Sequence, residues 1–156
     1  MRLSNIPHHL SNLLLVLWVG GIWAIGYLAV PVLFNSLTDR QLAGALAGSM
    51  FTLMSYIGIG CAVYFLGYKI YQSGWAASKQ NTFKLAASML LLVLIGLLGI
   101  QPVMVDMKAQ VAPLDIMHSP LAAQFKAMHV MASIIYLIQS LLGIALLIYQ
   151  FPKKNT

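Results

Sequence analysis

The sequence predicts an all-α protein whose four helices cross a lipid bilayer as a bundle. Hydrophobic residues make up 60% of the 156 residues, and only 8% are charged. A soluble domain carries roughly a quarter charged residues, so a chain this apolar needs the bilayer as its solvent. A membrane-spanning helix needs about 20 apolar residues. Stretches of that length lie at approximately 10–34, 46–71, 83–105 and 126–150.

The length of the chain predicts one transmembrane domain, residues 1–156. The sequence also contains no common catalytic motif. The formal net charge is +6, but the basic residues stand singly at the ends of apolar stretches, which indicates membrane topology and no nucleic-acid partner. One cysteine, Cys61, allows no intramolecular disulfide. The motifs of phosphate-binding loops, zinc proteases, dithiol oxidoreductases and serine hydrolases are absent from the sequence. The sequence therefore favours a protein that is not an enzyme.

The first apolar stretch is expected to stay in the membrane. It is too long for the core of a signal peptide and contains Trp18, Trp23 and Tyr27. Pro31 is expected to bend or end this helix, because proline lacks the backbone N–H that a helix interior requires. In the polar turn that follows, Thr38 or Asp39 is the candidate N-cap of the second helix.

Small residues recur at helical spacing in the first two stretches. Gly44 and Gly48 form a G-x-x-x-G pattern, and Gly20 and Ala24 have the same spacing. Small residues four positions apart let helix backbones approach closely in membranes. These residues predict helix-packing faces, which serve either association with another chain or ordinary packing inside the bundle.

The third stretch ends in a polar segment. Pro102 would release the carbonyl of Leu98 from its helical hydrogen bond. In lipid that carbonyl needs another partner, and Gln101 is the candidate. Residues 106–124, which contain two further prolines, are expected to form a long loop.

The distribution of charge predicts the orientation. With four spans, both termini and the middle connection share one side of the membrane. That side carries six of the nine basic residues, while the other carries three basic residues and all three acids. The positive-inside rule therefore places both termini in the cytoplasm, in the inner membrane if the cell is bacterial. The six basic residues are Arg2, Lys69, Lys79, Lys84, Lys153 and Lys154.

His129, near the outer end of the fourth span, is the leading candidate for chemistry. An ionisable group at a span is a functional candidate. It could bind a metal or haem iron, carry a proton, or simply form a hydrogen bond with Gln101, Asp106 or a backbone carbonyl. These readings stay open.

A second candidate group lies in the expected outer loop. His118 and Met117 have the soft-ligand character that suits copper(I), although methionine is also a common gap-filler. Met117, His118 and His129 are thus the candidate metal ligands, and haem b or copper the candidate cofactors. Asp106 is expected to pair with Lys108, Lys126 or His129.

The chain resembles a known family at the residues just described. The resemblance rests on Trp18 with Gly20, on Gly44, Gly48 and Phe51, and on Phe125 with His129. These elements are similar to the transmembrane protein 205-like family, also catalogued as domain of unknown function 4149. The resemblance implies four spans but defines no activity. A weaker similarity runs to copper-resistance protein D and HemJ-type haem proteins, although His9 lies farther before Trp18 than in those families.

Three hypotheses about function follow. The first is a non-enzymatic helical bundle that acts through self-association or association with a larger membrane partner. The second is a haem- or copper-binding redox or metal-handling protein that uses His129. The third is a transporter of a small solute or metal that works as an oligomer. The lipid bilayer is a partner in all three.

Overall fold

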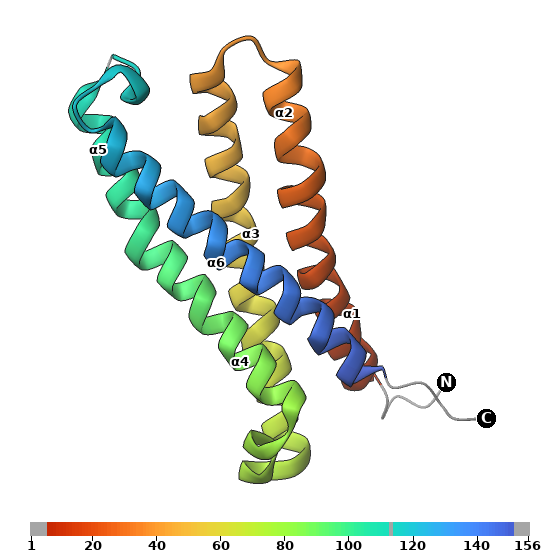
Figure 1. The fold of residues 1–156 in the computed structure, drawn as a ribbon. Helices are drawn as coiled ribbons and strands as arrows, with labels where there is room; N and C mark the ends of the chain where they lie inside the picture. The colour runs from red at the N-terminus through yellow and green to blue at the C-terminus, as the bar shows by residue number, and fades with distance from the viewer. Residues whose placement is uncertain (1–5, 113, 152–156) are drawn as a thin grey trace.

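The structure, a computed structural model, describes residues 6–112 and 114–151. In this part of the chain there is no strand, and four long helical segments alternate in direction (Figure 1). Each is long and apolar enough to cross a membrane, by length and composition. The prediction of a four-helix transmembrane bundle is therefore confirmed. The segments are Ile6–Ser36, Arg40–Lys79, Asn81–Val111 and Ala122–Gln150.

The first and third segments are interrupted by a wider, π-helical turn. The first consists of α1 (Ile6–Trp23), a π-helical turn (Ala24–Ala29) and α2 (Val30–Ser36). The third consists of α4 (Asn81–Leu94), a π-helical turn (Ile95–Ile100) and α5 (Gln101–Val111). The second is α3 (Arg40–Ser73), which a 3₁₀ turn (Gly74–Lys79) extends, and the fourth is α6 (Ala122–Gln150).

Each π-helical turn ends two residues before a proline. Proline crowds the carbonyl four positions earlier in its helix. For Pro31 that carbonyl belongs to Tyr27, and for Pro102 to Leu98, and both lie inside the π-helical turns. The wider turn gives the ring room, so the helix continues past each proline. Of the two effects expected of Pro31, bending or ending the first helix, the second is therefore wrong, because α2 runs on to Ser36.

The expected loop of residues 106–124 is shorter than predicted. α5 continues to Val111, and α6 begins at Ala122. Asp106 lies inside α5 and accepts a hydrogen bond from Gln110 Nε2 at 2.8 Å. This i, i+4 side-chain pair supports a helix in a segment that the neighbouring prolines had marked as loop.

Asp39 is the N-cap of α3. Its Oδ1 accepts hydrogen bonds from the backbone N–H groups of Gln41 at 2.8 Å and Leu42 at 3.0 Å. These donors have no partner within the helix, so the carboxylate satisfies them. Of the two candidates from the sequence, Asp39 takes the role and Thr38 does not.

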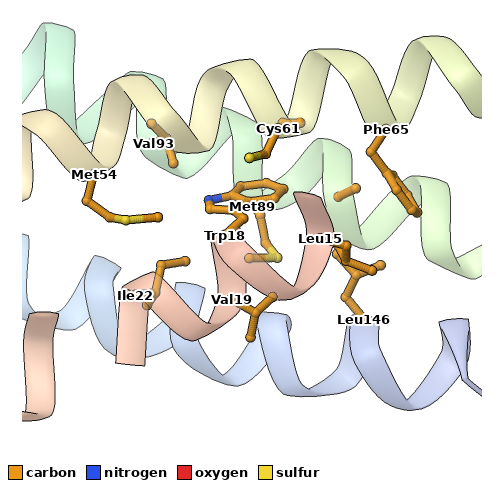
Figure 2. Packing of buried hydrophobic residues seen from close by; sticks show 12 residues of the cluster. Leu15, Trp18, Val19, Ile22, Met54, Cys61, Phe65, Met89, Val93 and Leu146 are labelled. Atoms are coloured by element: carbon orange, nitrogen blue, oxygen red, sulfur yellow. The ribbon is translucent and has the colours of Figure 1, made fainter. Parts of the chain in front are cut away.

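The hydrophobic core occupies the half of the bundle that holds the start of α1 and the end of α6. There α1 packs against α3, and α4 packs against both α3 and α6. Neither α2 nor α5 has a buried residue, so the opposite half is more open. Figure 2 shows the core, which comprises Leu15, Trp18, Val19, Ile22, Met54, Cys61, Ala62, Phe65, Ala86, Met89, Val93 and Leu146.

Candidate binding cleft

A cleft of about 1610 Å³ lies in the open half of the bundle. There the α2–α3 pair diverges from the α5–α6 pair, as Figure 1 shows. We call the end of the bundle with the α2–α3 turn and the α5–α6 loop the far end. The cleft reaches from Arg40 and Lys126 at the far end to Ile22, Val93 and Gln139 in the interior.

The wall that α3 contributes contains the predicted G-x-x-x-G pair. Gly44 and Gly48 both line the cleft. A Cβ atom added to Gly48 would meet no heavy atom within 4 Å, and one added to Gly44 would meet only Phe34 Cζ, at 4.0 Å. The described chain therefore offers no close-packed partner to this small-residue face.

Gly20 and Ala24 lie elsewhere. Both are exposed, neither lines the cleft, and a Cβ atom on Gly20 would meet nothing within 4 Å. The four predicted packing residues therefore belong to two separate surfaces. The close approaches inside the bundle occur at other glycines, among them Gly26, which lies against the ring of Tyr136.

One polar contact joins α5 to α3 beside the cleft. Gln101 Nε2 donates a hydrogen bond to Thr52 Oγ1 and a longer one, of 3.5 Å, to the carbonyl of Gly48. The sequence had suggested that Gln101 would serve the carbonyl of Leu98, but its amide instead reaches the neighbouring helix. The contact satisfies a polar side chain in a setting where lipid offers no partner.

A second polar group joins the first segment to α6. Tyr136 Oη donates to the carbonyl of Ile22, just before the π-helical turn. Tyr27 Oη and Ser140 Oγ share a hydrogen bond of 2.8 Å, and Trp23 Nε1 donates to the carbonyl of Ser140 at 3.4 Å. These bonds tie α6 to the turn at which the first helix changes its own hydrogen-bonding pattern.

Gln139, which lines the cleft, is 6% exposed. In the described part of α6, the side chains that make hydrogen bonds are those of Ser133, Tyr136, Ser140 and Gln150. The amide of Gln139 thus has no hydrogen-bond partner there. In the described chain the fully buried polar atoms without a partner are Ser11 Oγ and Trp18 Nε1, so the amide of Gln139 keeps some surface where its residue lines the cleft. This amide is suited to form a hydrogen bond with a group that enters the cleft.

Positive charge gathers at the far end of the cleft. Three cations, Arg40, Lys108 and Lys126, line it together with one acid, Asp115. Among residues 6–112 and 114–151, the single ion pair joins His118 Nδ1 to Asp115 Oδ2 at 3.6 Å, so these three cations have no acidic partner there. Lys108 Nζ lies 5.3 Å from the centroid of the Phe125 ring, a cation–π geometry.

The prediction that Asp106 pairs with a basic side chain is wrong. Its carboxylate takes the amide of Gln110, and no described ion pair joins it to Lys108, Lys126 or His129. The charged side chains at this end therefore do not neutralise one another across the cleft.

The structure brings two of the three candidate metal ligands to the cleft. His129 lines it, with its ring stacked on Phe125 at a centroid distance of 6.4 Å and an interplanar angle of 13°. Met117 also lines it, whereas the exposed His118 is not part of the lining and pairs with Asp115, which is. The described residues contain no group of three or more His, Cys, Asp and Glu side chains that could hold a metal ion. A haem or copper site at these residues stays a prediction.

Gln139 and Tyr136 are not among the residues predicted from the sequence. Gln139 and Ser140 form the polar pair in the middle of an otherwise apolar fourth stretch. Polar side chains inside a span usually face the bundle or a cavity. Their position alone would have marked this region of α6 as an inward-facing surface.

The chain was compared with known families, curated proteins and solved structures. Residues 13–113 match a family described as a domain of unknown function, DUF4149. This range contains Trp18, Gly44 and Gly48 and ends before Phe125 and His129. Neither a curated protein nor a solved structure matches the chain. Because the match covers well over half of the sequence, the chain belongs to the DUF4149 family.

Proposed function

We propose that this protein is a non-enzymatic helical bundle of the inner membrane that acts by association, with itself or with a larger membrane partner, through the cleft. The observation that carries the proposal is the unoccupied face of Gly44 and Gly48. Helices associate in lipid through close backbone packing and interhelical hydrogen bonds. Both glycines line the cleft with open space where a second helix would pack.

The proposal includes an orientation. Lys69, Lys79 and Lys84 lie at the end of the bundle opposite the far end, and the positive-inside rule assigns their end to the cytoplasm. The far end, with the three cations of the cleft, then faces the periplasm. A partner would therefore enter the outer half of the bilayer.

The redox and transport hypotheses draw on the same cleft. A haem- or copper-binding function would use His129 and Met117, which line it. A transporter would use the polar side chains of the lining, which include Thr52, Gln101 and Gln139, while the charged residues of the lining lie at the far end. The unpartnered glycine face gives association the stronger support.

The test compares two sets of glycine substitutions in α3. The double variant Gly44→Leu/Gly48→Leu fills the cleft wall. The matched control is Gly60→Leu, because Gly60 lies outside the cleft lining and a Cβ atom there also meets nothing within 4 Å. Each protein is purified from its native membrane in mild detergent, and the mass and composition of the particle are measured.

We expect wild type and the Gly60→Leu variant to purify as a complex, and the double variant to purify as a single chain. A strictly monomeric, partner-free wild-type particle would contradict the proposal. So would a double variant that keeps the complex intact.

A further inference from the structure

We propose that the cleft receives one transmembrane helix of a separate, single-span partner. This helix carries an acidic residue near the far end and a hydrogen-bonding side chain at the depth of Gln139. The inference rests on the proposed function and specifies the kind of partner. Three features of the cleft support it, namely its size, its unpartnered amide and its charge.

The size of the cleft suits a single helix. A helix about 10 Å wide has a cross-section of about 80 Å², so 1610 Å³ corresponds to about 20 Å of helix, or about 13 residues. Lys126 and Gln139, which both line the cleft, are 13 residues apart on α6, again about 20 Å at 1.5 Å per residue. The volume and the length of the cleft therefore agree on one short helical stretch.

Gln139 favours a helix over a lipid as the occupant. Its side chain is more than nine-tenths buried, lines the interior end of the cleft and makes no hydrogen bond within the described chain. An acyl chain at this depth has no polar group to offer. A Ser, Thr, Asn or Gln side chain on an entering helix would form a hydrogen bond with the Gln139 amide. Gly44 and Gly48 allow the close approach of the two helices that such a bond needs.

The charge at the far end predicts an acidic partner. Arg40, Lys108 and Lys126 line the far end of the cleft, and none of them forms an ion pair in the described chain. The one acid of the lining, Asp115, pairs with His118.

A second copy would bring the same three cations, while its three acids are already engaged within their own chain. Asp39 caps α3, Asp106 accepts from Gln110, and Asp115 pairs with His118. Each of its four helices is also packed in its own bundle. A single-span helix with an Asp or Glu near the far end would pair with the three cations. It would avoid the like-charge repulsion that a second copy brings.

The experiment places a photo-reactive amino acid in the full-length protein in its native membrane. The probe replaces Val130, which is exposed and lines the cleft. The matched control replaces Ile138, another exposed aliphatic residue of α6 that lies outside the lining. After irradiation, mass spectrometry identifies each adduct and the cross-linked peptide.

We expect the Val130 probe, and not the Ile138 probe, to capture the span of one single-span protein with an acid near its periplasmic end. Gln139→Leu should reduce this adduct about three- to twentyfold, the range for loss of one interhelical hydrogen bond. Lys126→Glu should also reduce it, and replacing the partner's acid with lysine should restore it.

A Val130 adduct formed only with lipid, with a second copy or with a multi-span protein would overturn the inference. A cross-linked span that lacks an acid would also overturn it. An adduct with a second copy that disappears in the Gly44→Leu/Gly48→Leu variant would leave the proposed function standing while this inference fails.

Discussion

The indole of Trp18 on α1 lies directly against the backbone of Gly58 on α3. A Cβ atom on Gly58 would lie 2.5 Å from Trp18 Nε1 and 3.0 Å from Cδ1. Trp18 has no exposed surface, and it stands in the middle of the core shown in Figure 2. The close approach of the first and second spans thus depends on a glycine opposite the largest side chain of the core.

Gly58→Ala is expected to destabilise the bundle by about 1–3 kcal/mol, the usual cost of overpacking a core. The added methyl group must displace an indole that is surrounded by packed side chains. Thermal or denaturant unfolding of the purified protein in detergent measures the change in the free energy of unfolding.

Gly60→Ala is the control for this prediction. Gly60 lies two positions further on the same helix, where a Cβ atom meets nothing within 4 Å. Its substitution should be neutral or should stabilise by up to about 1 kcal/mol, because alanine is the better helix former. Equal stability of the two variants would show that the indole does not press on Gly58.

Tyr136→Phe is expected to destabilise the protein by about 0.6 kcal/mol, the average for polar contacts between membrane helices, and by no more than about 1.7 kcal/mol, their maximum. The substitution removes the hydroxyl that donates to the carbonyl of Ile22 and leaves the ring in place. Unfolding in detergent is compared with that of Tyr149→Phe, whose ring is 57% exposed. A loss no larger than that of the exposed control would refute the assigned role.

The bond between Gln101 and Thr52 is tested by a double-mutant cycle. Gln101→Leu and Thr52→Val should each destabilise the protein, and the double variant should lose less than the sum of the two. The coupling free energy is expected to be about 0.6–1.7 kcal/mol. Additive effects would mean that the two side chains act independently and that Gln101 has its main partner elsewhere.

The sequence predicted the four apolar helices because the bilayer sets the length and hydrophobicity that a spanning helix needs. The cap at Asp39 was also predictable, since its side chain satisfies local N–H groups regardless of the tertiary fold. The π-helical turns before Pro31 and Pro102 were not. Whether a proline ends a helix or is accommodated depends on whether the turn before it can widen, and the sequence pattern does not show this.

The cleft was less accessible to sequence reasoning than the spans. Gly44 and Gly48 were recognised as a packing face, but the pattern does not distinguish a face filled within the bundle from an empty one. Of the predicted metal ligands, Met117 and His129 line one cavity while His118 does not, and this depends on the path of the loop after α5. The position of Gln139 within a span indicates an inward-facing residue, but only the structure shows that it lines the cleft.

The predicted orientation is tested by reporters fused to the full-length chain. A fluorescent protein that folds only in the cytoplasm should be bright after Thr156, because the positive-inside rule places the C-terminus inside. A phosphatase that is active only in the periplasm should be inactive there and active when inserted after Thr38, in the α2–α3 turn. Reversing the charge bias, by replacing Lys79 and Lys84 with glutamine and adding lysines beside Thr38, should reduce the bright population. An active phosphatase after Thr156 in the unmodified protein would place the far end of the cleft in the cytoplasm. An acidic residue at the periplasmic end of the partner would then be ruled out.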